Sequence, residues 1–433
     1  MKNRKILLIT SLLVWAILAN SQSNKPETDP GTLRAAIAKT DITPEIPVKL
    51  YGYASRKDYS EGVHDPLSAR VVAFENNGRR VVLISSDLGS YSRDVFPVIR
   101  KSIMDKYKLG ESEIFISAIH SHSAPILSLD QENGDPNNVK YTQTLNQKLL
   151  DLVGEALAGM KPVRTAVGSG SSPVGVNRRE MRADGSIVLG RNPYGPHDKE
   201  VLVMKIEDTD GNAMGALFDY ATHATSLGPR NLRISGDVLG ISAQFAEKIL
   251  GNGMITPVFA GASADIDPWY RVLPEFNTEN GWIPEPVMLG TLLGQEVVHV
   301  YRKIGAGSPG GAVRSSYATL ECPRKKRPEQ EATAAAQNQS PTVPVNITAA
   351  RIGDDIAIIG FSVEMLTEVG MAIKAGSPCK HTFIITHCNG SSGYLPPKGL
   401  YKEGGYEVTT SNFEIGSAEM VVKKALTMLY DLK

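Results

Sequence analysis

Two histidines separated by one residue, His120 and His122, are the clearest indication of chemistry in this sequence. Residues 113–118, just before them, are mostly apolar and β-branched, which predicts a short buried strand. Imidazole nitrogens bind metal ions and carry protons near neutral pH. Ser121 and Ser123 are small enough to leave room for an ion or a substrate beside the two rings. Two histidines alone are weak evidence, so the case depends on what other segments contribute.

Further polar clusters also come directly after predicted strands. In chain order they contain His223, the acidic segment 263–268, Glu364 and the pair Gly393-Tyr394. Strand ends that feed loops on one edge of a sheet are where α/β proteins place their sites. Imidazoles from separate loops together with a glutamate suit zinc in a catalytic site, which keeps one position for water. From spacing alone, scattered surface histidines are an equally open alternative.

Strand-like and helix-like patterns alternate between these clusters. Apolar residues recur with helical spacing near residues 94–107, 145–156, 238–250, 286–304 and 415–432. Short apolar or alternating runs predict strands near residues 71–74, 81–84, 201–206, 213–218, 356–361 and 382–386. This alternation predicts an α/β protein with mixed β-sheets flanked by helices.

Composition narrows the class of protein. The 433 residues are 42% hydrophobic and 21% charged, as in globular proteins with a large core. The formal net charge is zero and aromatic residues make up 6%, so no nucleic-acid surface is indicated. The three cysteines, Cys322, Cys379 and Cys388, allow one disulfide and one free thiol, with no pairing favoured.

The N-terminus has the pattern of a secretory signal. Lys2, Arg4 and Lys5 precede an apolar run, and small residues follow it, so residues 1–21 are predicted to be a signal peptide. Residues 22–34 are predicted to be a flexible lead-in and residues 35–433 a single domain. We therefore expect a secreted or periplasmic protein with no integral membrane segment after signal cleavage.

A series of short motifs runs along residues 36–410. They are Asp41-Ile42-Thr43-Pro44, Tyr51-Gly52-Tyr53-Ala54, Gly62-Val63-His64, Ser86-Asp87-Leu88-Gly89, His120-Ser121-His122-Ser123-Ala124-Pro125, Asn177-Arg178, Tyr220-Ala221-Thr222-His223, Ser235-Gly236-Asp237, Gly393-Tyr394 and Tyr406-Glu407. In this order they resemble the catalytic N-terminal domain of the neutral (non-lysosomal) ceramidases. These are zinc amidases of lipid metabolism that cleave the N-acyl bond of ceramide.

The resemblance implies a neutral-ceramidase-type domain with one Zn²⁺ and specific roles for its residues. The metal ligands that it implies are His120, His223, Glu364 and Tyr394. It also places His122 and Arg178 near the scissile group and Tyr406 at the oxyanion. Zinc would activate water and polarise the carbonyl, while a phenol or guanidinium would stabilise the developing oxyanion.

The sequence departs from the family pattern in ways that concern the substrate. Asp267 stands where the family has a serine needed for activity. Glu364 lies in the altered frame Ser362-Val363-Glu364-Met365, and we expect no further immunoglobulin-like domain within this chain. A carboxylate beside the metal suits a polar substrate, or a different general base, better than a lipid amide.

The sequence thus predicts an exported, zinc-dependent, ceramidase-like amidohydrolase acting on C–N bonds. Zinc-bound water would attack the amide of an N-acyl compound, a lipid or glycoconjugate more polar than ceramide, with Asp267 or His122 managing protons. Two alternatives stay open: a zinc hydrolase of a sugar-linked ester or glycosidic bond, and a catalytically silent homologue that binds metal or ligand. His64 and His387 are expected to be structural.

Overall fold

The computed structural model describes residues 31–269, 285–326 and 340–433. The predicted signal peptide and residues 22–30 of the predicted lead-in lie outside these ranges. One compact unit runs from Gly31 to Lys433. None of the helices in the described ranges is both long enough and apolar enough to span a bilayer.

The larger sheet has nine strands, with β14 paired to β6 beside the main order β12-β10-β9-β6-β1-β3-β4-β5. The strands are β1 (Arg34–Asp41), β3 (Ser68–Asn76), β4 (Arg79–Ser86), β5 (Ile114–Ala118), β6 (Lys161–Ser171), β9 (Glu200–Asp208), β10 (Ala213–Tyr220), β12 (Val258–Ala260) and β14 (Ser308–Pro309). The pairs β4–β5 and β10–β12 are parallel, whereas the other pairs are antiparallel. The sheet is therefore mixed, as the sequence predicts.

A second sheet of four strands packs against the first. Its strands are β15 (Val313–Pro323), β16 (Thr342–Ile352), β17 (Ile356–Phe361) and β19 (His381–Ile385), in that order. Side chains from both sheets share one buried cluster, in which Phe74 and Leu83 of the larger sheet meet Ile358 and Phe383 of the smaller. Strands β3, β4 and β17 are almost continuously buried because both of their faces are covered.

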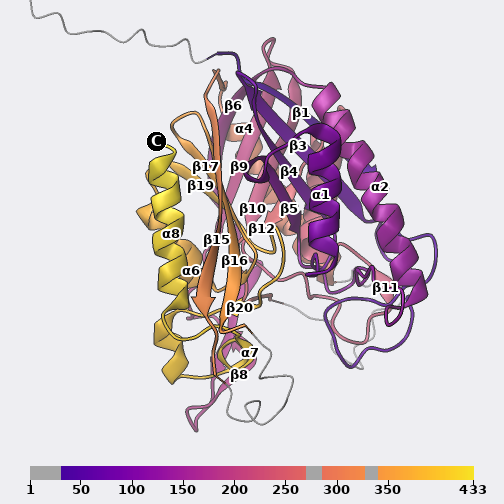
Figure 1. Cartoon of the computed structure of the whole chain (residues 1–433), viewed down its shortest axis with the longest axis vertical. Helices are drawn as coiled ribbons and strands as arrows, with labels where there is room; N and C mark the ends of the chain where they lie inside the picture. The colour runs from indigo at the N-terminus through magenta and orange to yellow at the C-terminus, as the bar shows by residue number, and fades with distance from the viewer. Residues whose placement is uncertain (1–30, 270–284, 327–339) are drawn as a thin grey trace, which may run out of the picture. The chain divides into compact units, whose positions relative to one another are not determined.

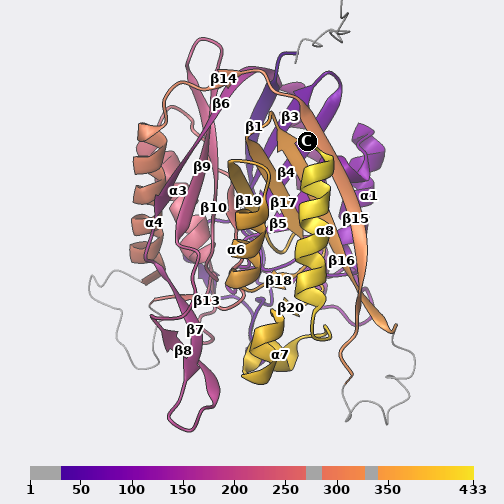
Figure 2. The ribbon, with the colours of Figure 1, turned by 90° about the vertical axis from the view of Figure 1, so that its left-hand side faces the viewer.

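Helices cover the outer face of each sheet (Figures 1 and 2). They are α1 (Val95–Tyr107), α2 (Pro136–Ala158), α3 (Asp237–Leu250), α4 (Glu285–Lys303), α6 (Thr367–Gly376) and α8 (Ser417–Asp431). Helices α1 and α2 pack on the β1, β3, β4 and β5 side of the larger sheet, and α3 and α4 pack on its β6, β9 and β10 side. Helices α6 and α8 cover the smaller sheet. The layers run helix, sheet, sheet, helix.

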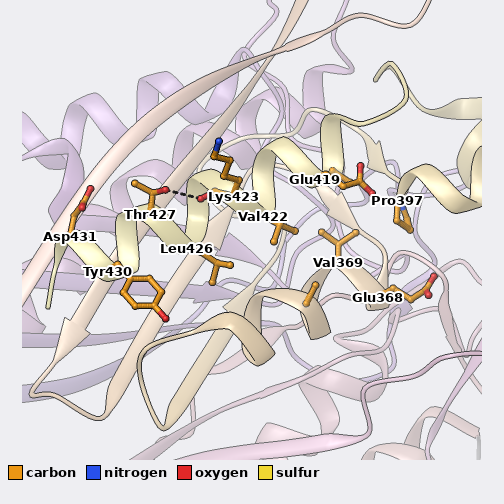
Figure 3. Close-up of a pocket in the computed structure, with 12 residues that line it drawn as sticks. Glu368, Val369, Pro397, Glu419, Val422, Lys423, Leu426, Thr427, Tyr430 and Asp431 are labelled. Atoms are coloured by element: carbon orange, nitrogen blue, oxygen red, sulfur yellow. Dashed lines mark hydrogen bonds between the residues drawn. The ribbon is translucent and has the colours of Figure 1, made fainter.

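An apolar groove of about 650 Å³ lies between α6 and α8 on the outer side of the smaller sheet. Val369, Val422, Leu426 and Tyr430 point into it from the two helices (Figure 3). The described residues that line this groove include no predicted site residue.

Short elements gather at one end of the two large sheets, in the lower part of Figure 2. They are β2 (Gly62–Val63), β7 (Gly175–Met181), β8 (Ile187–Asn192), β11 (Arg233–Ile234), β13 (Ile266–Pro268), β18 (Glu364–Met365), β20 (Tyr394–Leu395), η2 (Lys398–Lys402) and α7 (Tyr406–Thr410). The short helix η1 (Glu111–Glu113) instead precedes β5, at the opposite end of that strand from His120. Strand β7 pairs with β8 and β13, and β18 pairs in parallel with β20. These elements carry most of the predicted site residues.

Candidate metal centre

His120 lies in the loop that follows β5, and its backbone has a positive φ of 63°. Its Nδ1 atom lies 2.9 Å from the carbonyl oxygen of Gly89. Because a carbonyl can only accept a hydrogen bond, Nδ1 must carry the ring proton. The Nε2 atom therefore keeps its lone pair, which is the arrangement that metal-binding histidines use.

His223 follows β10 and is held in the same way. Its Nδ1 atom lies 2.7 Å from the carbonyl oxygen of Ser263 and 3.1 Å from that of Ile266. The proton is therefore on Nδ1, and Nε2 is the acceptor. Burial lowers the pKa of His223 well below its usual value, and the nearby Arg178 and His120 lower it further. The neutral ring is the form that binds a metal ion.

The imidazoles of His120, His122 and His223 converge, with one ring nitrogen from each within 4.8 Å of the others. The Nε2 atoms of His120 and His122 are 3.3 Å apart. Burial, followed by the neighbouring His120 and His223, lowers the pKa of His122 well below its usual value. Its Nδ1 atom is buried and has no hydrogen-bond partner in the described part of the chain. Three imidazoles facing one point fit a divalent cation.

Glu364 and Tyr394 lie opposite each other in the β18–β20 pair. The Oε2 atom of Glu364 is 3.5 Å from Nε2 of His120 and has no hydrogen-bond partner among the described residues. Burial alone would raise the pKa of Glu364, but His120, His387 and Tyr394 outweigh it and lower the pKa to about 2. An ionised carboxylate beside the imidazoles adds a hard oxygen donor to the cluster.

Arg178 links the remaining polar groups of the site. Its guanidinium lies 2.7 Å from Glu407 through Nε, 3.2 Å from Asp267 through Nη1 and 3.4 Å from the Tyr394 hydroxyl through Nη2. Burial would lower the pKa of Arg178, but Asp267, Tyr394 and Glu407 raise it well above its usual value. The guanidinium is therefore a fixed positive charge, and its Nη1 also lies 3.4 Å from Nε2 of His223.

Asp267, on β13, is buried between two guanidiniums. Its Oδ1 faces Arg178, and its Oδ2 lies 3.4 Å from Nη1 of Arg191 on β8. A buried charge is tolerated when polar partners compensate it, and here two cations do so. The negative charge of Asp267 therefore does not by itself exclude an alkyl chain from the site.

Tyr406 begins α7 at the edge of this cluster and is 44% exposed. Its ring centroid lies 5.5 Å from that of Tyr394 in an edge-on arrangement and 5.8 Å from the Arg178 guanidinium carbon. The phenol is thus close to Arg178 and still accessible. Its predicted role at the oxyanion stays a prediction.

Two residues that were given no role from the sequence, Glu407 and Arg191, lie in or beside the site together with His387. Glu407 is fully buried and binds both Arg178 and Arg179, and it could have been found because it follows Tyr406 in the Tyr-Glu motif. Arg191 had no distinguishing signal in the sequence. His387 was expected to be structural, but its ring stacks on that of His120.

The other expectations have mixed outcomes. His64 is structural, as expected, because its Nδ1 lies 2.7 Å from Asp65. Cys322, Cys379 and Cys388 are all free and buried, so the disulfide that the sequence allowed does not form in the described structure.

The site consists of buried imidazoles and a carboxylate at the ends of strands, within helix–sheet–sheet–helix layers. This is a candidate metal centre of the kind that hydrolases use. Residues 34–264 match the sequence profile of the family described as neutral/alkaline non-lysosomal ceramidase, N-terminal. The chain belongs to this family.

Individual relatives agree with that assignment. The neutral ceramidase of Oryza sativa subsp. japonica is 28% identical over 217 residues, which are 48% of this chain and 28% of the rice protein. The neutral ceramidase of Pseudomonas aeruginosa is 26% identical over 246 residues, 54% of this chain and 36% of that protein. The matched region thus spans about a third of these relatives.

Solved structures share the fold. The crystal structure of the Pseudomonas aeruginosa neutral ceramidase superimposes with a TM-score of 0.77 and 17% identity, covering 93% of this chain and 74% of that one. A structure of a ceramidase complexed with C2 gives a TM-score of 0.75 and 18% identity, covering 93% and 75%. This likeness confirms the predicted mixed α/β fold.

Proposed function

We propose that this protein is a zinc-dependent hydrolase that cleaves the amide bond of N-acyl compounds. The observation that carries the proposal is the convergence of three imidazoles within 4.8 Å, next to the ionised Glu364. Membership of the ceramidase family supports an amide as the bond that is cleaved.

His120, His223 and Glu364 would hold the ion, and Tyr394, paired with Glu364 across β18 and β20, would complete the set. The buried Oε2 of Glu364, which has no hydrogen-bond partner among the residues that the structure describes, and the Nδ1–H bonds of both histidines fit this role. When bound, zinc supplies a Lewis acid and lowers the pKa of a water molecule toward ~7.

The other residues would orient the substrate and move protons. Arg178 points a guanidinium past Tyr394 toward His223, so it can donate to the carbonyl oxygen as negative charge develops there. His122 is better placed than Asp267 to take a proton from water and pass it to the departing amine. Asp267 already faces two guanidiniums, whereas the neutral ring of His122 presents Nε2 to the converging nitrogens, 3.3 Å from Nε2 of His120.

Tyr406→Phe should slow turnover by ~10²-fold or more while the metal stays bound, which is the usual effect of removing one oxyanion donor. Steady-state kinetics and metal analysis of the same sample would check this. Loss of metal would instead mean that Tyr406 is a ligand, and unchanged turnover would make it a packing residue.

For the substrate, we propose N-acyl compounds more polar than long-chain ceramide. The ion pair of Asp267 with Arg191 would have to be covered by any alkyl chain that passes over it, and covering a partly exposed ion pair costs hydration energy. The proposed preference therefore rests on the hydration of this ion pair and not on the negative charge of Asp267, because two guanidiniums compensate that charge.

A release assay on long-chain ceramide beside a panel of polar N-acyl compounds would test this proposal. We expect cleavage of polar amides, negligible cleavage of ceramide, and a large loss of the native activity in Asp267→Asn with the metal retained. Efficient ceramide cleavage would overturn the substrate preference alone. Bound metal with no cleavage of any acyl substrate would favour the silent binding homologue, and cleavage of sugar-linked esters or glycosides would favour the other alternative.

We also propose that the protein is exported to the periplasm or secreted. The support for this is the N-terminal sequence, in which Lys2, Arg4 and Lys5 precede the apolar run.

A further inference from the structure

The imidazole of His387 lies flat against that of His120. The ring centroids are 3.8 Å apart, and the planes are inclined by only 12°. His387 is 3% exposed, and its Nε2 atom has no hydrogen-bond partner in the described part of the chain. Stacked rings at this distance are in direct contact over their faces, so neither can turn without displacing the other.

The backbone of His387 fixes this contact from both sides. Its N–H donates to the carbonyl of Val363, one residue before Glu364, and its carbonyl accepts from the N–H of Ala118 at the end of β5. The φ of His387 is 51°, a left-handed conformation that a non-glycine residue rarely adopts without compensating contacts. The residue therefore joins the loop of His120 to the loop of Glu364.

The inclination of its ring separates His387 from the three converging histidines. A metal ion lies in the plane of an imidazole that binds it, along the nitrogen lone pair. The planes of His122 and His223 are inclined to that of His120 by 80° and 67°, so their lone pairs can meet at one point. The nearly parallel plane of His387 lies beside that of His120, so the two rings cannot both bind the same ion well.

We propose that His387 is a positioning residue, whose stacked ring fixes the plane of His120 so that Nε2 points at the metal ion. The hydrogen bond from Nδ1 of His120 to Gly89 anchors only one edge of the His120 ring. The stack with His387 removes the remaining freedom to tilt about that bond. This inference rests on the proposed metal centre.

Two variants separate stacking from polar contact. His387→Phe keeps an aromatic face but removes both nitrogens, whereas His387→Asn keeps a polar group and tolerates the left-handed backbone but removes the ring. The exposed His299→Ala on α4 serves as a control. Zinc affinity would be measured by competition with a chromophoric chelator, and the ligand field by the visible spectrum of the cobalt-loaded proteins.

We expect His387→Asn to bind zinc ~10–100-fold more weakly, which is the usual effect of losing a residue that orients a ligand. His387→Phe should keep an affinity close to that of the unmodified protein and an unchanged cobalt spectrum, and so should His299→Ala. Circular dichroism of the metal-free proteins would show that each variant is folded.

The reverse order, with weak binding by His387→Phe and normal binding by His387→Asn, would show a polar role and overturn the inference. Normal affinity in both variants would also overturn it while leaving the proposed function intact. An unmodified protein that binds no zinc would overturn the proposed function and this inference with it.

Discussion

His223→Ala is expected to remove most of the bound zinc and nearly all hydrolytic activity. The imidazole is buried, its proton is fixed on Nδ1 by two carbonyls, and its Nε2 is one of three converging nitrogens. Zinc affinity should fall by more than the ~100-fold that loss of a merely orienting residue can cost. Metal analysis and turnover measured on one preparation would check both effects.

The neighbouring histidine gives a sharper comparison. His122→Ala should abolish turnover but keep zinc if His122 moves protons, and should lose zinc if it is a ligand. His299→Ala should change neither quantity, because its side chain is exposed and lies on α4. Full zinc retention in both His120→Ala and His223→Ala would contradict the metal centre.

Arg178→Met is expected to lower the free energy of unfolding by about 3–5 kcal/mol as well as abolish turnover. The substitution leaves Glu407 and Asp267, each with a side chain only 1% exposed, without their shared cation. Each carboxylate keeps one guanidinium, Arg191 for Asp267 and Arg179 for Glu407, but both lose a buried partner at once, and removing one partner of a buried ion pair costs this much. Urea unfolding would measure the change in stability.

Acid should partly relieve this loss of stability. Protonation neutralises buried carboxylates that have lost one of their two cations, so the deficit of Arg178→Met should shrink as the pH falls. Lys101→Met is the matched control, since the side chains of Lys101 and Asp105 are 76% and 65% exposed. Removing that pair should cost less than about 1 kcal/mol. Equal losses in the two variants would show that the Arg178 network is not structurally important.

Local sequence patterns were sufficient to predict many of the core strands and helices, but not the short elements β7, β13 and β18 that carry Arg178, Asp267 and Glu364. Residues 356–361 coincide with β17, and the predicted helix over residues 238–250 differs from α3 by one residue. Buried runs of apolar residues identify such segments, because the core requires them and few polar residues interrupt them. The polar clusters that follow strand ends include His120, His223 and Glu364, and in the structure these three side chains lie near one another.

The connections within the site could not be predicted, because they depend on distant segments. Arg178, Asp267 and Glu407 come together only after β13 pairs with β7 and α7 packs beside them. His387 lies two residues after β19, which ends at Ile385 and is an ordinary buried strand. No periodicity in the sequence therefore distinguishes His387. Its role depends on a ring angle that only the folded chain defines.

Metal removal and return is the most direct test of the central claim that this protein is a zinc-dependent N-acyl hydrolase. The purified protein would be stripped with a zinc chelator, assayed on the polar N-acyl panel, and titrated with zinc. We expect activity to disappear on stripping and to return in proportion to added zinc, reaching its limit at about one equivalent. Undiminished activity in the stripped protein, with its metal content confirmed to be near zero, would contradict the claim.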